Sequence, residues 1–121
     1  MQKNPSIESS SNSNELRWDS TKCGTGISFE NNKALVFLKE QAYVFRSVTT
    51  TFGFTSGVHY WEIVADSRTE NELKIGVSTS NNFDFNTAFC DHPFGYAYYG
   101  LGQLRSGSNS SGNQYGKRLK K

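Results

Sequence analysis

The sequence predicts an all-β protein built as an antiparallel β-sandwich, and three observations lead to this prediction. Apolar and polar residues alternate with a period of two along several short runs, most clearly in VHYWEIVAD (58–66) and LKIGVS (73–78). No window carries a sustained apolar stripe with a 3.6-residue period, so nothing favours a long helix. Glycine, asparagine and serine separate the runs, as turn residues do. Many short strands with regular turn signals are typical of two packed antiparallel sheets.

The first half of the chain supplies the earlier predicted strands. Structure is predicted to begin at ELRWDS (15–20), where a leucine and a tryptophan two residues apart share one face. The run ENNK (30–33) predicts a hairpin turn between the strands ISF (27–29) and ALVFL (34–38). The run AYVFRSV (42–48) alternates again and predicts a further strand.

The two clearest strands, 58–66 and 73–78, follow one another across a short polar connection, which predicts an antiparallel hairpin. Their alternation indicates that one face of each strand is buried. The side chains predicted to fill the space between two sheets are Trp61, Ile63, Leu73, Ile75 and Val77.

The rest of the chain is less regular. TSNNFDFNTAF (79–89) predicts at most one helical turn, and GYAYYGLGQL (95–104) alternates like a strand. RSGSNSSGNQYG (105–116) predicts a polar, flexible loop. Residues 1–14 are polar and rich in serine and asparagine, and we expect a flexible tail because nothing there can offset the entropy of ordering it.

Composition indicates one folded domain and argues against several classes of partner. The chain has 121 residues, and its 14% aromatic content is too high for a disordered protein. Net charge is +2, but four basic residues lie within 117–121, and without them nine basic residues face eleven acidic ones. Bulk charge therefore gives no support to nucleic-acid binding. The sequence shows neither a membrane span nor a signal peptide, and two distant cysteines make no disulfide framework, so we expect a cytoplasmic protein.

Candidate catalytic and metal-binding groups are weak. Cys90, Asp91 and His92 have the chemistry of a nucleophilic site, but neighbouring residues do not easily aim their side chains at one another. Cys23 and His59, together with Cys90 and His92, lack the close Cys–Cys and His–His spacings of structural zinc sites. We therefore predict that the chain is not an enzyme and that it carries no metal or cofactor.

Several motifs together resemble a SPRY domain, the core of the B30.2 module. FTSGVHYWEI (54–63) is similar to the most recognisable signature of that family, and LKIGVS (73–78) is similar to the strand that follows. LRWD (16–19), GYAYYGLGQL (95–104) and NQYGKRL (113–119) resemble further family strands in the same order. The resemblance covers residues 15–121 and implies a concanavalin-like antiparallel β-sandwich. The family's Gly-Asp turn and closing strands do not appear, so 15–121 is predicted to be the N-terminal portion of the domain, incomplete at its C-terminus.

The resemblance also implies a function. SPRY domains are non-catalytic modules that bind proteins or peptides, often as the substrate-selecting part of a ubiquitin ligase. Their contacts commonly lie in loops at one end of the sandwich. Carried over by position, one such loop holds Lys39, Glu40 and Gln41, and the other holds Phe83, Asp84, Phe85 and Asn86. In the second loop, the alternative is that one or both phenylalanines cap the core.

Two other functions stay open at this stage. The chain is alternatively a structural subunit whose sheet is completed by a neighbouring chain, because missing strands would expose apolar faces and unpaired edges. The third reading is a carbohydrate-binding sandwich with Tyr98 or Tyr99 as an aromatic platform. A flat row of exposed tyrosines on a sheet face would favour carbohydrate, whereas an exposed loop pocket would favour a protein partner.

Overall fold

The computed structural model describes residues 16–39, 44–107 and 109–119 of the chain. Over these residues it contains eight strands and one short 3₁₀ helix, η1. In chain order the elements are β1 (Trp18–Cys23), β2 (Ile27–Glu30), β3 (Leu35–Leu38), β4 (Val48–Thr50), β5 (Lys74–Ser78), η1 (Phe89–Asp91), β6 (Gly95–Tyr99), β7 (Gln103–Ser106) and β8 (Asn109–Gln114).

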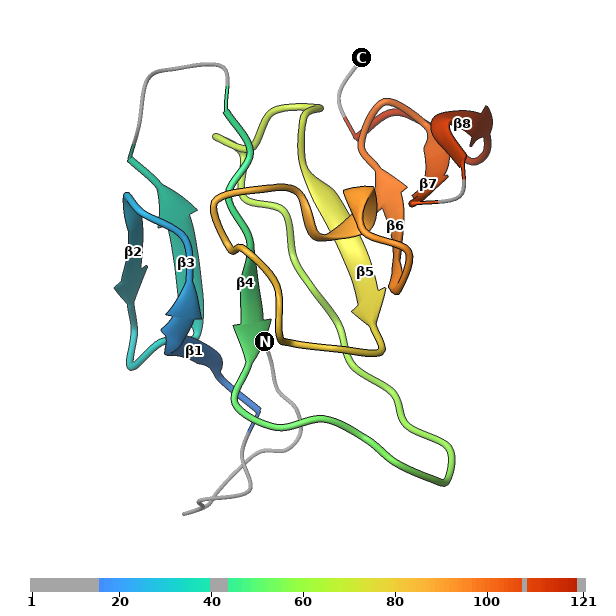
Figure 1. Cartoon of the computed structure of the whole chain (residues 1–121). Helices are drawn as coiled ribbons and strands as arrows, with labels where there is room; N and C mark the ends of the chain where they lie inside the picture. Colours follow the sequence, from blue (N-terminus) through green and yellow to red (C-terminus); the bar gives the residue numbers. More distant parts are fainter. Residues whose placement is uncertain (1–15, 40–43, 108, 120–121) are drawn as a thin grey trace.

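The strands form three antiparallel sheets in the part of the chain that the structure describes (Figure 1). Two of them are pairs, β1 with β4 and β2 with β3, and the third is a four-stranded sheet in the order β5-β6-β7-β8. The predicted all-β, antiparallel class is therefore confirmed. The sandwich itself and the incomplete C-terminus stay predictions.

The hairpin between β2 and β3 confirms the predicted turn at 30–33. Ile27 lies opposite Leu38, and Glu30 lies opposite Leu35. The turn places three consecutive residues, of which Asn31 is the first, at positive φ, between 53° and 66°. Asparagine tolerates this left-handed region better than most residues, which explains why the sequence has two of them here.

The predicted strand at 58–66 is not formed. No strand lies between the end of β4 and the start of β5, although all these residues are described. The chain instead leaves the sheets after β4, turns back near Gly57 (φ 87°) and reverses into β5 (Figure 1). Trp61 and Ile63 are exposed, so the prediction that they fill a core is wrong. The physical reason is that alternation supplies a face for burial, whereas a strand also needs a neighbouring backbone to bond, and 58–66 has none.

The four-stranded sheet buries the face opposite to the one predicted. Ile75 lies opposite Tyr98, and Val77 lies opposite Tyr96, so these four side chains share one face. Val77 and Tyr96 are 50% and 52% exposed, which contradicts the prediction of a buried Val77. The covered face is the opposite one, which carries Ala97, because Ala88 and Cys90 cluster with Ala97 and the partly buried Phe45 and Phe89 pack against this cluster.

The core beneath this covered face is small. Cys90 and Ala97 are buried in it together with Ala88, and Phe45 and Phe89 pack against them. A Cβ atom at Gly95 would collide with the carbonyl oxygen of Phe89, so glycine there lets η1 approach β6 closely. The predicted single helical turn thus exists, at 89–91, just beyond the irregular stretch that suggested it.

The predicted loop at 105–116 instead forms most of a hairpin. Leu104 of β7 lies opposite Asn113 of β8, and Ser106 lies opposite Asn109. β8 is an edge strand, since it pairs with β7 alone in the sheet order. Edge strands can be polar because one side of their backbone stays in solvent, and serine and asparagine are depleted in strands generally. These two facts explain why the sequence pattern missed β8.

Ser47, directly before β4, is a buried junction between distant segments. Its side chain is 5% exposed, and its hydroxyl donates to the carbonyl oxygen of Thr87 at 2.7 Å. The Ser47 hydroxyl oxygen also accepts from the backbone N–H of Phe89 at 3.0 Å. Its own backbone N–H donates to Phe85 at 2.8 Å, and its carbonyl accepts from Gly24 at 2.9 Å. One serine therefore joins β1, β4 and the segment that leads into η1.

Ser47→Ala tests this junction. The variant leaves the buried N–H of Phe89 and the carbonyl of Thr87 without their partner, so we expect the free energy of unfolding to fall by about 1–3 kcal/mol. Chemical denaturation measures the loss. Ser111→Ala, at an exposed position on β8, is the control and should change stability by less than about 0.5 kcal/mol. Equal stability of the two variants would contradict the assigned role.

The two cysteines should differ in reactivity. Burial raises the pKa of the Cys90 thiol, which is 1% exposed. Burial, with the nearby Asp19 charge as a smaller cause, also raises the pKa of Cys23, but that thiol is only partly covered. Since the thiolate is the reactive form, a thiol reagent at pH 8 should modify Cys23 slowly and Cys90 only after unfolding. Mass spectrometry of the labelled peptides identifies the site, and rapid labelling of Cys90 in the folded protein would contradict the structure.

Candidate functional site

The loop before η1 carries four of the predicted contact residues, and it is organised around stacked rings. The rings of Phe83 and Phe85 stack with centroids 4.3 Å apart. Phe83 also lies 5.7 Å from Phe94 and 5.4 Å from His92, whose ring stacks on Phe94. We call these four residues the loop aromatic cluster. All four are half-buried, which favours the alternative that the phenylalanines help to cap the fold.

The two polar members of this loop hold its backbone. A carboxylate oxygen of Asp84 accepts from the N–H of Asn86 at 2.9 Å, which is a local turn. The side-chain oxygen of Asn86 accepts from the N–H of Thr25 at 2.8 Å, across 61 positions of sequence. A Cβ atom at Gly24 would collide with the carbonyl oxygen of Phe85, so the loop and the turn after β1 are in close contact. Asp84 and Asn86 therefore position the loop, and their backbone neighbours fix it in place.

The other predicted loop is only partly described. Lys39 follows β3, is exposed, and donates its backbone N–H to Gly26 at 3.0 Å. Glu40 and Gln41 lie outside the described residues. Among the described residues, no interaction joins Lys39 to the loop aromatic cluster. The structure thus brings together the 83–86 group and does not join Lys39 to it.

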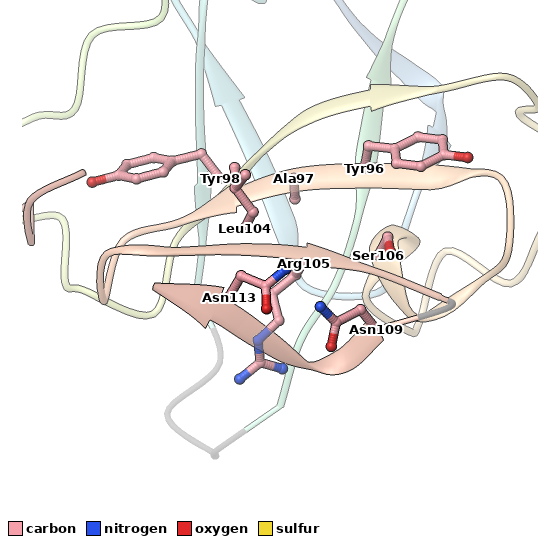
Figure 2. Close-up of a pocket in the computed structure, with 8 residues that line it drawn as sticks. All are labelled: Tyr96, Ala97, Tyr98, Leu104, Arg105, Ser106, Asn109 and Asn113. Atoms are coloured by element: carbon pink, nitrogen blue, oxygen red, sulfur yellow. The ribbon is translucent and has the colours of Figure 1, made fainter. Parts of the chain in front are cut away.

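A pocket of about 400 Å³ lies on the four-stranded sheet, in a place where the sequence predicted no site except the tyrosines. Figure 2 shows the rings of Tyr96 and Tyr98 extending in opposite directions along β6, with Ala97 and Leu104 between them. The pocket is lined by Tyr96, Ala97, Tyr98, Leu104, Arg105, Ser106, Asn109 and Asn113. We call its exposed side, together with Ile75 and Val77, the open sheet face.

The open sheet face combines apolar surface with hydrogen-bonding groups. Leu104 is 42% exposed beside the tyrosines. The side chains of Asn109 and Asn113 border the pocket from β8, and each amide supplies both donors and an acceptor. Such a surface can bind a ligand through shape, apolar contact and hydrogen bonds.

Arg105 supplies the positive charge near this face. Its guanidinium lies 4.9 Å from the ring centre of Tyr99, and its Nε donates to the side chain of Gln103 at 2.9 Å. Leu104 and Arg105 leave β7 on opposite sides, so the charge lies at the border of the pocket rather than in its centre (Figure 2). The covered face also holds Lys74, whose ammonium group lies 3.9 Å from the ring centre of Phe45.

The groups considered for nucleophilic or metal chemistry are placed apart from this face. Cys90 is buried in the core, and the ring Nε2 of His92 shares a hydrogen bond of 2.8 Å with the hydroxyl of Thr87. Within the described ranges, no three His, Cys, Asp or Glu side chains are grouped so that they could hold a metal ion. No helix in those ranges is long and apolar enough to cross a membrane.

Sequence reasoning missed several members of the open sheet face. Asn109 and Asn113 fell within the predicted loop, and only a recognised β7–β8 hairpin would have placed them. Leu104 ended the predicted aromatic strand, whereas the structure breaks that run at 100–102 and starts β7 at Gln103. The two glycines at 100 and 102 were the available signal for this turn.

No protein-family model, no curated protein and no solved structure matches this chain. The SPRY resemblance is therefore a prediction that rests on the sequence motifs alone.

Phe83→Ala separates a structural role from a contact role. The ring is half-buried against three other rings, so its removal should lower the free energy of unfolding by about 1–2 kcal/mol. Thermal and chemical denaturation measure this loss. Asn82→Ala, one residue earlier and exposed, is the matched control and should leave stability unchanged. If Phe83→Ala leaves stability unchanged, the ring does not support the fold, and Phe83 remains a candidate for contact with a partner.

Proposed function

We propose that this chain is a non-catalytic recognition module that binds a protein or peptide partner through the open sheet face. The observation that supports this most is the exposure of apolar side chains on a hydrogen-bonded, four-stranded sheet. Val77, Tyr96 and Leu104 lie together there on three neighbouring strands and stay in contact with water. A contiguous exposed apolar patch marks an interaction site more often than scattered apolar residues do.

The composition of the face fits a protein partner. Tyrosine is enriched where binding energy concentrates in protein interfaces, and this face offers Tyr96 and Tyr98. The amides of Asn109 and Asn113 can bond the peptide backbone of a ligand, which has both N–H and carbonyl groups to satisfy. A rigid sheet also presents these groups without much ordering cost on binding.

A finer form of the proposal follows from the motif resemblance. A SPRY-type module would act in the cytoplasm as an adaptor, for example as the substrate-selecting part of a ubiquitin ligase. In that form Lys39, Asp84 and the residues near them would contribute contacts from the loops. The exposed apolar face equally fits the alternative of a subunit whose sheet is completed by a neighbouring chain.

Carbohydrate binding is the second candidate, and the tyrosines favour it specifically. Tyr96 and Tyr98 lie on one sheet face with Asn109 and Asn113 beside them, and sugars pair aromatic stacking with amide hydrogen bonds. The Tyr98 hydroxyl donates to the carbonyl of Lys117, which fixes that ring. Against this candidate, the two rings extend in opposite directions and form no continuous flat platform (Figure 2). Tyr99, the other predicted platform, is buried.

Peptide selection tests the proposal. A random peptide library displayed on phage is selected against the full chain, and the affinity of the resulting synthetic peptide is measured by calorimetry. We expect Tyr96→Ala and Leu104→Ala each to weaken binding about tenfold, because each removes exposed apolar contact area from the interface. Both side chains are already exposed, so unfolding measurements should show little loss.

Two controls make the result decisive. Lys22→Ala, on β1 and away from the face, should leave peptide affinity unchanged. A glycan array probed with the same protein tests the second candidate, and glycan binding lost in Tyr96→Ala with no peptide selected would replace the proposal with carbohydrate recognition. A peptide whose affinity is insensitive to both face variants would show that the site lies elsewhere.

A further inference from the structure

The segment VHYWEIV, Val58 to Val64, is an exposed apolar run outside every sheet of the described chain. Val58 is 100% exposed, Tyr60 83% and Val64 75%. The segment lies on a stretch that extends away from the sheets in Figure 1, at the end of the excursion between β4 and β5. It is separate from the open sheet face, so an inference about it goes beyond the proposed function.

The backbone of this segment is unpaired in the described part of the chain. Among the described residues, no backbone–backbone hydrogen bond involves residues 53–65, whereas Thr51 and Thr69 on either side both make one. Seven consecutive residues rich in valine, isoleucine, tyrosine and tryptophan have a strong preference for a strand. A segment with strand preference and free N–H and carbonyl groups is a template for pairing with another strand.

Neighbouring rings hold the segment in place. The ring of Phe54 stacks on His59 with centroids 4.0 Å apart and on Trp61 with centroids 5.6 Å apart. Phe52 packs edge-on against Phe54 at 5.8 Å. His59 and Trp61, on one side of the segment, are thus held against Phe54. The side chains of Val58, Tyr60 and Val64, on the other side, point to solvent.

The solvent-facing positions of the segment are partly symmetric about Trp61. Two of the four pairs of positions equally distant from this residue match: valine stands at both 58 and 64, and small residues stand at both 57 and 65, whereas His59 and Ile63 differ. Tyr60 and Glu62 form the pair nearest the centre, and within the chain the Tyr60 hydroxyl already donates to the Glu62 carboxylate at 2.9 Å. In an antiparallel pair, residues opposite one another have numbers with a constant sum, so a strand with this symmetry is complementary to itself.

We infer that Val58–Val64 pairs antiparallel with the same segment of a second copy, around a two-fold axis at Trp61. In this register Val58 of one copy lies opposite Val64 of the other, and Tyr60 lies opposite Glu62. On the solvent-facing side each dimer then gains two valine–valine contacts, and each Tyr60 hydroxyl can donate to Glu62 of the other copy in exchange for the hydrogen bond that it makes within its own chain. The new ladder pairs backbone groups that make no backbone–backbone hydrogen bond to another described residue. Both copies use the same patch, which makes the contact closed and limits it to a dimer.

The size of the contact sets the expected strength. One seven-residue ladder is smaller than the interface of a stable obligate dimer, which buries about 2,000 Å² or more of surface in total. We therefore expect a reversible dimer that forms with rising concentration, over roughly 1–100 μM. Sedimentation velocity of the full chain across that range measures it.

Two matched valine variants locate the contact. Val64→Asp places a charge opposite Val58 twice in each dimer, so we expect dimerisation to weaken about tenfold. Val77→Asp makes the same change on the open sheet face and should leave dimerisation unaltered. Loss of the dimer in Val77→Asp alone, or a monomer at every concentration of the unmodified chain, would overturn the inference.

Disulfide cross-linking tests the register. In a Cys23→Ser background, where the remaining Cys90 is buried, single cysteines are placed at 58, 59, 63 and 64. Mixing the 58 and 64 variants, and separately the 59 and 63 variants, should give cross-linked heterodimers under mild oxidation, at least in one of the two mixtures. One mixture must hold a close, non-hydrogen-bonded pair because the two pair types alternate along a ladder. Each variant alone should cross-link far less, and equal cross-linking of single variants and mixtures would overturn the register.

Discussion

The hydrogen bonds around Ser47 are the constraint on which the arrangement of the sheets depends. β1 and β4 form a pair with only limited surface of their own, and the four-stranded sheet begins more than twenty residues later. The Ser47 side chain and backbone connect these parts through Thr87, Phe89 and Phe85. Beside this junction, the rings of Phe45 and Tyr99 meet edge to face at 6.1 Å. The hydrogen bonds of Ser47 therefore fix how the β1–β4 pair is joined to the segment before η1, and the Phe45–Tyr99 contact packs beside them.

Because this junction covers one side of the four-stranded sheet, it also decides which side stays open. The covered face carries Ala97, Ser78 and the buried Tyr99, and the open face carries Ile75, Val77 and Tyr98. An apolar face in water loses the stabilisation that burial would give, about 25 cal/mol for each Å². Anything that covers the face in the folded state alone adds to stability by mass action. If a partner binds this face as proposed, its binding would therefore also stabilise the fold.

The sequence predicted one hairpin from its turn residues and failed where the outcome depends on a distant segment or on a polar edge strand. The β2–β3 hairpin was predictable because the turn residues at 31 and 32 and both strands lie within twelve positions. The alternation at 58–66 was read correctly as strand preference, yet alternation says nothing of whether a second backbone is available. The wrong face was predicted for β5 for the same reason, since Phe45 and η1 determine which face is covered and lie at least 11 positions from β5 in the sequence. β8 was missed because an edge strand needs no apolar residues.

The two exposed apolar surfaces, the open sheet face and the Val58–Val64 segment, would act together if both bind as proposed. A two-fold pairing of the segments leaves both sheet faces free, because the segment shares no strand with β5 to β8. A dimer then presents two identical faces in a fixed relation. Binding of one face raises the effective concentration of the second site on a partner with repeated epitopes, and avidity exceeds the single-site affinity by about 10²–10⁴ when the geometry allows both contacts. Even if the open sheet face binds each epitope weakly, the dimer would thus select partners that carry the recognised feature more than once.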